Sequence, residues 1–160
     1  ILISTGIRIS ELCDLRREQI SYSERTIRIY GKGNKERILP VYNENLWKEI
    51  KQYEKLFGLE MKEYFFVNRI NNKLSDQSVR NMIKRICKKA SIPMNITPHM
   101  FRHTFATLLL ENDVDSRHIQ QILGHSSITT TQIYTNITSN KKIEIMKYKN
   151  PRLKISISKG

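Results

Sequence analysis

Three consecutive helices are marked in the second half of the chain by residues that begin and end helices, and they constrain the fold more than any other feature. Ser75 is suited to cap a helix that runs to about Ala90, and Thr97-Pro98 begins another that reaches about Glu111. Asp115 caps the third helix, which stops at Gly124. These closely spaced signals predict a mainly α-helical domain.

Apolar residues recur at helical spacing within these segments and predict which faces are buried. In the first two helices the expected inner residues are Val79, Met82, Ile83, Ile86, Phe105, Leu108 and Leu109. Asn112 is predicted to take the left-handed conformation that ends the second helix. A short helix is expected to contain residues 129–134, another to span 140–148, and residues 153–157 alternate like an added β-strand.

The first third of the chain departs from the helical pattern. Residues 26–30 and 37–41 alternate apolar and polar residues on either side of a turn rich in glycine and asparagine, and they predict an antiparallel β-hairpin. Helices are expected over Glu11–Arg17, with Ser10 as its N-cap, and over Asn45–Phe57. The predicted fold class is therefore mainly α with a small antiparallel β-sheet (α+β).

The charge of the chain favours a polyanionic partner. Lys and Arg total 28 against 15 Asp and Glu, which gives a formal net charge of +13 and a pI near 9.9. Such an excess attracts nucleic acid without specifying its sequence, and the alternative is a solvated basic surface.

Other bulk features bear on location. Cys13 and Cys87 have no partner at metal-ligand spacing and are expected to be reduced, buried thiols of a cytoplasmic protein. No apolar run reaches the roughly 20 residues of a membrane span, so no membrane association is expected. The chain opens with the apolar residues Ile1-Leu2-Ile3, which suggests that it begins partway through a longer protein.

Two histidines, an arginine and a tyrosine in the second half of the chain form a set suited to phosphoryl transfer. His99 and Arg102 share one helix face in a first turn, where backbone N–H groups also favour an anion. His125 follows a glycine that ends a helix, and Tyr134 lies in a polar segment. Arginine grips phosphate with its planar fork, histidine moves protons near neutral pH, and tyrosine can attack covalently. The alternatives are a capped core helix with incidental polar residues and a tyrosine anchored at the surface.

A metal site on the same helix is disfavoured. His103 lies four residues after His99, but Met100 stands where a zinc protease helix has glutamate, and Arg102 would place a cation beside the metal. His103 is instead predicted to be packed or hydrogen-bonded. We expect no metal ligands and no cofactor.

Charged residues of the first third add to the candidate set. Arg8 and Glu11 are one helical turn apart, and they form either an exposed pair worth about 0.3–0.5 kcal/mol or a carboxylate that holds a guanidinium toward phosphate. Lys32 and Lys35 lie in the hairpin turn, where they are either solvated or reach into a DNA groove.

Four segments together resemble the tyrosine recombinases, the group of phage-type integrases and Xer-type resolvases. They occur in the family's order, and the resemblance extends from Thr5 to about Arg152. The matching segments are residues 5–12 (TGIRISEL), 31–37 (GKGNKER), 99–107 (HMFRHTFAT) and 123–134 (LGHSSITTTQIY).

The resemblance implies the tyrosine recombinase catalytic-domain fold and a role for each matching position. The implied catalytic residues are Arg8, Lys32, His99, Arg102, His125 and Tyr134, with Glu11 as a supporting acidic residue and Lys35 and Arg37 as candidates for DNA contact. Tyr134 would be the nucleophile that forms a 3′-phosphotyrosine, while Arg8 and Arg102 would clamp the scissile phosphate. His125 would bond a non-bridging oxygen, His99 would act as base or hydrogen-bond partner, and Lys32 would be the general acid.

The resemblance also implies organisation, partners and activity. Residues 1–138 would form an N-terminally truncated catalytic domain, and residues 139–160 a tail that docks onto a neighbouring protomer through Ile143, Met146 and Tyr148. The alternative for residues 139–160 is a basic, frayed tail. The expected function is metal-independent, site-specific recombination of double-stranded DNA by a homo-tetramer. The alternatives are a non-catalytic DNA-binding or regulatory fragment of this fold, a helix-turn-helix transcription factor, and a relaxing topoisomerase. Covalent trapping on DNA separates the recombinase and topoisomerase from the other two.

Overall fold

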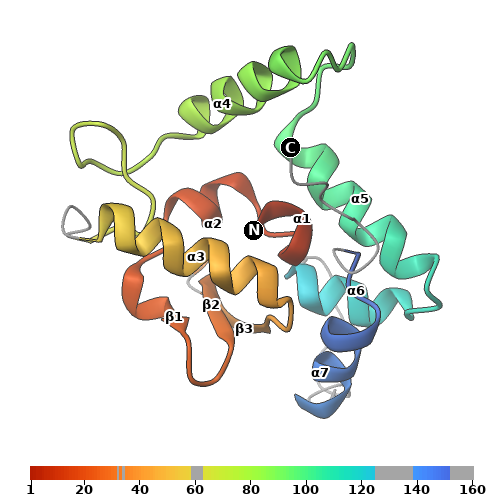
Figure 1. Ribbon diagram of the computed structural model, residues 1–160. Helices are drawn as coiled ribbons and strands as arrows, with labels where there is room; N and C mark the ends of the chain where they lie inside the picture. Colours follow the sequence, from red (N-terminus) through yellow and green to blue (C-terminus); the bar gives the residue numbers. More distant parts are fainter. Residues whose placement is uncertain (32, 34, 59–62, 125–138, 152–160) are drawn as a thin grey trace.

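A computed structural model describes residues 1–31, 33, 35–58, 63–124 and 139–151 of the chain, with the side chains of 139–141 excepted. Helices predominate, and a three-stranded antiparallel sheet lies near the N-terminus (Figure 1), so the predicted fold class is confirmed. The elements are α1 (Leu2–Thr5), α2 (Ile9–Cys13), a 3-10 turn (Arg17–Gln19), β1 (Ile20–Ser21), β2 (Thr26–Tyr30), β3 (Glu36–Pro40), α3 (Glu44–Phe57), α4 (Asp76–Lys89), α5 (Pro98–Leu110), α6 (Ser116–Leu123) and α7 (Ser139–Tyr148).

The predicted β-hairpin is confirmed as β2 and β3. Ile27 pairs with Leu39 across the hairpin, and these two side chains and Ile29 are buried, while the alternate residues Arg28 and Tyr30 face solvent. This alternation places one face of the sheet against the core. The two-residue strand β1, which the sequence did not reveal, pairs with the other edge of β2.

Side-chain caps begin α4 and α6 where the sequence predicts them, and Asn43, a cap that the sequence analysis did not name, begins α3 one residue earlier than expected. Asn43, Ser75 and Asp115 accept backbone N–H groups in the first turns of α3, α4 and α6. Pro98 is the first residue of α5, after Thr97, whose side chain makes no capping bond. These contacts satisfy N–H groups that have no partner within the helix.

The prediction for α2 was wrong at both ends. The helix begins at Ile9 after Arg8, in place of a start after Ser10, because the Glu11 carboxylate accepts the Arg8 backbone N–H at 2.7 Å. It ends at Cys13, well before Arg17, and the following 3-10 turn is separately closed by a bond from the Arg16 N–H to the Gln19 side chain.

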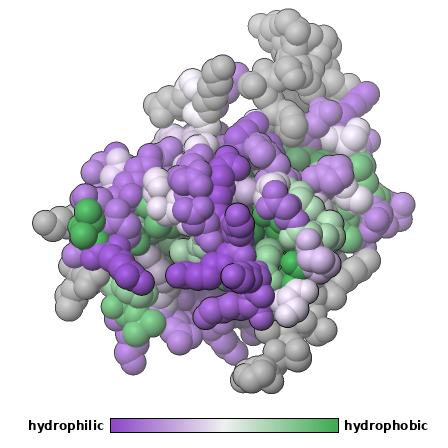
Figure 2. Space-filling model, turned by 90° about the horizontal axis from the view of Figure 1, so that it is seen from above, coloured by the Kyte–Doolittle hydropathy of each residue, from purple (hydrophilic) through white to green (hydrophobic). Residues whose placement is uncertain are grey.

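The predicted inner face of α4 was partly wrong. Val79, Ile83 and Cys87 are buried, whereas Met82 is 41% and Ile86 55% exposed. The buried residues are four apart, so α4 contacts its neighbours along a single line of side chains. Figure 1 shows α4 beyond α2, away from α3 and the sheet, and the surface seen from that side is mostly hydrophilic with smaller hydrophobic patches (Figure 2).

The end of α5 also differs from the prediction. The left-handed residue is Asp113, with φ 58°, and not Asn112. The Asn112 amide instead donates to the Leu108 carbonyl, while the Val114 N–H donates to the Leu109 carbonyl at 3.1 Å. These bonds help to satisfy the carbonyls of the final turn, and the chain reverses one residue later than predicted.

The helix α7 packs against the rest of the same chain. Ile145 and Met146 are buried in the common hydrophobic core, and the Asn150 amide donates to the Ser4 carbonyl at 2.9 Å. Of the three predicted docking residues Met146 is buried, whereas Ile143 and Tyr148 are exposed. The predicted helix within 129–134 and strand within 153–157 lie outside the described residues.

Two expectations about buried groups and membranes can be compared directly with the structure. Cys13 and Cys87 are buried and not disulfide-bonded, as predicted. Among the residues that the structure describes, no helix has both the length and the apolar character needed to cross a membrane.

Gly6, the residue that ends α1, packs closely against side chains of α5 and α6 and carries a stability prediction. Its φ is +63°, and a Cβ there would lie 2.5 Å from a Phe105 ring carbon and 2.7 Å from a Leu123 methyl group. We expect Gly6→Ala to lower the free energy of unfolding by about 3 kcal/mol or more, from backbone strain plus overpacking, as measured by urea denaturation.

Gly33→Ala is the matched control for the backbone strain. Gly33 has a similar φ of +75°, but no described atom lies within 4 Å of the added Cβ, so a loss of only about 1 kcal/mol is expected. Equal losses at the two positions would contradict the importance of the close approach at Gly6.

Candidate active site

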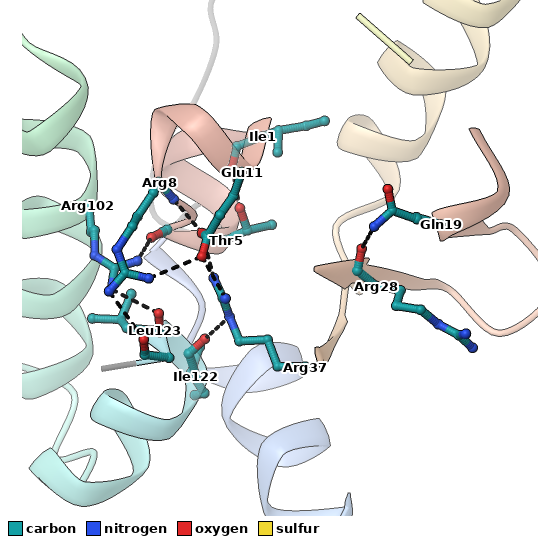
Figure 3. A network of polar contacts seen from close by, with 12 residues as sticks. Ile1, Thr5, Arg8, Glu11, Gln19, Arg28, Arg37, Arg102, Ile122 and Leu123 are labelled. Carbon is teal, nitrogen blue, oxygen red and sulfur yellow. Dashed lines mark hydrogen bonds and ion pairs between the residues drawn. The ribbon is translucent and has the colours of Figure 1, made fainter. Parts of the chain in front are cut away.

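The buried carboxylate of Glu11 is the centre of the polar network shown in Figure 3. It lies in the first turn of α2, with its side chain only 5% exposed. Oε2 accepts the Arg8 backbone N–H at 2.7 Å, and Oε1 accepts Arg8 Nη1 at 3.1 Å. Arg37 Nη1 and Nη2 donate to Oε1 and Oε2 at 2.8 Å each, so this second guanidinium binds both oxygens. Burial alone would raise the pKa of Glu11, but the bonds from Arg37 and Arg8 and their charges outweigh burial and lower it.

Arg37 extends from β3 into the interior and joins three elements. In addition to its two bonds to Glu11 on α2, its Nε donates to the Ile122 carbonyl in α6 at 3.0 Å. Its side chain is only 9% exposed. Gly124 lies against the guanidinium, since a Cβ at that residue would be 3.0 Å from Arg37 Nη1. All three guanidinium nitrogens of Arg37 are therefore engaged inside the protein.

Two further arginines reach the same end of α6. Arg102, on α5, donates from Nη1 to the Gly6 carbonyl at 2.7 Å and from Nη2 to the Leu123 carbonyl at 2.9 Å. Arg8 Nη2 donates to the Gly124 carbonyl at 3.2 Å. The Arg8 side chain is 35% exposed, so this guanidinium remains accessible to a ligand.

The C-terminus of α6 thus holds all three guanidinium groups. The successive carbonyls of residues 122, 123 and 124 accept hydrogen bonds from Arg37, Arg102 and Arg8 respectively. These carbonyls have no partners within the helix and carry the negative end of its dipole, which favours cations. The left-handed Gly124, with φ 68°, turns the chain so that its carbonyl faces Arg8.

The network carries more positive than negative charge. The guanidinium groups of Arg8 and Arg37 bind the carboxylate of Glu11, and that of Arg102 joins the same network through the carbonyls of Gly6 and Leu123. Burial and the nearby charges of Arg8 and Arg37 lower the pKa of Arg102 to about 10, and only Glu11 acts in the opposite direction. An arginine whose charged form is disfavoured by neighbouring cations marks a site suited to an anion.

The structure brings part of the predicted site together. Arg8, Glu11 and Arg102 share one network, and His99 lies on α5 one turn before Arg102 and is exposed. Lys35 is exposed beside the hairpin turn. The predicted residues Lys32, His125 and Tyr134 lie outside the described residues.

Sequence reasoning missed the internal role of Arg37 and misjudged His103. His103 is exposed on α5, so of the two predicted alternatives, packed or hydrogen-bonded, the packed one was wrong. The partner of Arg37 lies 26 residues away in sequence, and no local spacing signals such a pair. Within the described ranges, no three His, Cys, Asp or Glu side chains are grouped as metal ligands.

Comparisons with known proteins identify relatives of the chain. The sequence profile of the phage integrase family matches residues 1–141. A tyrosine recombinase of Agathobacter rectalis is 51% identical over 154 residues, which cover 95% of this chain and 50% of that protein. Tyrosine recombinase XerD of Halalkalibacterium halodurans is 39% identical over 157 residues, covering 95% of this chain and 52% of the relative. The chain therefore spans about half the length of these relatives.

Solved structures show the same fold. The crystal structure of XerA recombinase superposes with a TM-score of 0.71 at 39% identity, covering 90% of this chain and 52% of that one. XerH recombinase bound to its difH substrate gives a TM-score of 0.70 at 27% identity, covering 79% and 38%. These likenesses confirm the predicted tyrosine recombinase catalytic-domain fold. From its sequence and its fold alike, the chain belongs to the phage integrase family.

Proposed function

We propose that the chain is the catalytic domain of a tyrosine-type enzyme that recombines DNA at specific sites. The observation that carries the proposal is the cluster of Arg8 and Arg102 on the α6 C-terminus, where burial and the neighbouring charges of Arg8 and Arg37 lower the pKa of Arg102. A phosphodiester gains negative charge as its phosphorus is attacked, so two fixed guanidinium groups stabilise the transition state more than the ground state.

In the proposed reaction, the Tyr134 oxygen attacks the scissile phosphorus and the bond to the 5′-oxygen breaks. The products are a 3′-phosphotyrosine and a free 5′-hydroxyl, whose proton comes from Lys32 as general acid. Arg8 and Arg102 hold the non-bridging oxygens. His125 adds a hydrogen bond to them, and His99 assists the removal of the tyrosine proton.

Rejoining reverses these steps. The 5′-hydroxyl of another strand attacks the phosphotyrosine and releases Tyr134. The covalent intermediate conserves the phosphodiester bond energy, so the scheme needs no nucleotide cofactor. Arginine and lysine supply the positive charge at the phosphate, a role that metal ions take in two-metal nucleases.

The proposed partner is double-stranded DNA, and the proposed assembly is a homo-tetramer on DNA. The net charge of +13 supports the first, as does XerH, which is bound to difH in its solved structure. Cytoplasmic location is also part of the proposal, supported by two buried cysteines without disulfides. We further propose that residues 139–160 exchange between protomers, although α7 packs on its own chain here.

A suicide-substrate trap tests the proposed reaction. The chain is incubated in EDTA with a library of nicked duplexes whose core sequence is randomised, and covalent adducts are separated on a denaturing gel. We expect an adduct with the wild-type chain and none with Tyr134→Phe, which lacks only the attacking oxygen.

The other outcomes distinguish the alternative functions. The trap is repeated with the N-terminal half of the Agathobacter relative fused ahead of Ile1. If no adduct forms with or without this fusion, a non-catalytic DNA-binding or regulatory fragment is favoured. An adduct accompanied by relaxation of supercoiled plasmid, without recombinant products, would favour a topoisomerase.

A further inference from the structure

Arg37 is buried, yet it is not one of the residues that the proposed reaction places on the phosphate. Its guanidinium binds both oxygens of Glu11 on α2 at 2.8 Å, and its Nε binds the Ile122 carbonyl of α6 at 3.0 Å. A largely buried arginine that donates a hydrogen bond from each of its three nitrogens holds its partners in one geometry, because each planar N–H group has a fixed direction.

We propose that Arg37 is a positioning residue that fixes the catalytic arginines and the hairpin relative to one another, and that it does not contact DNA. This replaces the direct DNA contact expected from the sequence and rests on the proposed function. The side chain is 9% exposed, and each of its three nitrogens already donates a hydrogen bond within the protein.

The first link is through Glu11 to Arg8. Glu11 Oε1 accepts both Arg37 Nη1 and Arg8 Nη1, and Oε2 accepts both Arg37 Nη2 and the Arg8 backbone N–H. Arg37 binds both oxygens from one planar group and so fixes the plane of the carboxylate, whereas Arg8 contributes its backbone N–H at 2.7 Å and a longer side-chain bond. Arg8 is then held by a single side-chain bond of 3.1 Å to Glu11 and keeps its exposed edge for a ligand.

The second link is between the hairpin and α6. Arg37 belongs to β3, five positions after Lys32, and its Nε bond reaches Ile122, next to the Leu123 carbonyl that holds Arg102. Gly31 is at the base of the turn, and a Cβ added there would lie 3.6 Å from both Arg37 Nη1 and Glu11 Oε1. Arg37 therefore ties the segment that carries the proposed general acid to the arginines that hold the phosphate.

Arg37→Lys tests the inference, with Arg28→Lys as the matched control. Lysine keeps the charge, but one ammonium on a flexible stem lacks the planar fork that spans both Glu11 oxygens and the Ile122 carbonyl. Arg28 lies on the adjacent strand, is half exposed and pairs with Glu36 at 3.4 Å. Single-turnover adduct formation is followed on the nicked suicide duplex, at a temperature well below the melting temperature of each variant. DNA affinity is measured separately by fluorescence anisotropy.

The expected result is a rate constant about 10- to 100-fold lower for Arg37→Lys, because misplacement of fixed groups by an ångström has effects of this size. Its DNA affinity and final adduct yield should equal those of wild type, and Arg28→Lys should match wild type in all three. A purely structural role would lower the yield of active protein without changing the rate constant, and that result would overturn the inference.

A second variant covers the case in which Arg37→Lys does not fold. In Gly124→Ala the new Cβ would meet Arg37 Nη1 at 3.0 Å and Cζ at 3.2 Å, which presses on the guanidinium while leaving its charge in place, and the φ of +68° also strains the backbone whose carbonyl binds Arg8. The same slowing at full yield is expected. An unchanged rate in a folded variant would overturn the role of Arg37 alone, whereas wild-type chain that forms no adduct would overturn the proposed function and this inference together.

Discussion

Replacing Arg102 with lysine is expected to slow adduct formation by about 1,000-fold, the upper range for removing one fixed donor from a developing oxyanion. Arg102 is held by two carbonyls from different elements, those of Gly6 and Leu123. A lysine cannot satisfy both carbonyls and also face a phosphate, because its donors diverge from a single nitrogen. DNA affinity should fall much less, since many phosphate contacts contribute to it.

The effect of Arg102→Lys should grow with pH. Burial and the charges of Arg8 and Arg37 lower the pKa of Arg102 to about 10, so the wild-type site stays charged at pH 7–9. The same causes would lower the pKa of a lysine there, starting from an ordinary value of about 10.4, toward the assay pH. The variant would lose its positive charge as pH rises, and the ratio of wild-type to variant rate should increase.

Rates of adduct formation between pH 6.5 and about 9 measure this ratio, and Arg17→Lys is the control. Arg17 is 59% exposed and pairs with Glu54 away from the site, so its variant should follow the wild-type pH profile. A ratio that stays constant with pH would contradict the electrostatic argument, and a ratio near one would remove Arg102 from the catalytic set.

The helices and the hairpin could be predicted because their signals are local. Ser75 and Asp115 bond to N–H groups three and two residues away, and the alternation of residues 26–30 depends only on which face of the strand is buried. The face that α4 buries could not be predicted in this way, because it depends on how much of the helix its neighbours cover. Met82 and Ile86 match the helical pattern but lie beyond the line of contact.

In the site, too, the predicted part depends on local signals and the missed part on contacts between distant segments. The Arg8–Glu11 pair is visible at helical spacing, but its burial is not, and an exposed pair of little value was the alternative. Burial comes from Arg37 and from the end of α6, which lie far along the sequence. Local patterns thus identify the charged residues, while long-range contacts decide which of them face a ligand and which hold the others in place.

Removing the carboxylate at the centre of this network should cause the second large effect. Glu11→Ala is expected to lower the free energy of unfolding at pH 7 by about 3–5 kcal/mol, because it leaves the guanidinium of Arg37 buried without its partner. Glu11→Gln keeps one acceptor oxygen and the side-chain volume, so its loss should be smaller. Urea denaturation of the three proteins measures both losses.

The loss caused by Glu11→Gln should diminish in acid. The bonds and charges of Arg37 and Arg8 outweigh burial and hold the pKa of Glu11 below its ordinary value. The stabilisation from this carboxylate is therefore complete above the carboxyl pKa of the unfolded chain and is lost as pH falls through the lower, folded-state pKa. Below that pKa the wild-type side chain is neutral like glutamine, so the two proteins should have similar stability.

Glu36→Gln separates the buried carboxylate from ion pairing in general. Glu36 pairs with Arg28 at 3.4 Å on the exposed side of the hairpin, and loss of such a pair changes stability by no more than about 1 kcal/mol. If Glu11→Gln were no more destabilising than Glu36→Gln at pH 7, or if its effect were the same at pH 3 and pH 7, the carboxylate would not be the element that holds Arg8 and Arg37. A larger loss of stability that diminishes in acid is expected only if the buried, charged carboxylate of Glu11 is needed to hold Arg8 and Arg37.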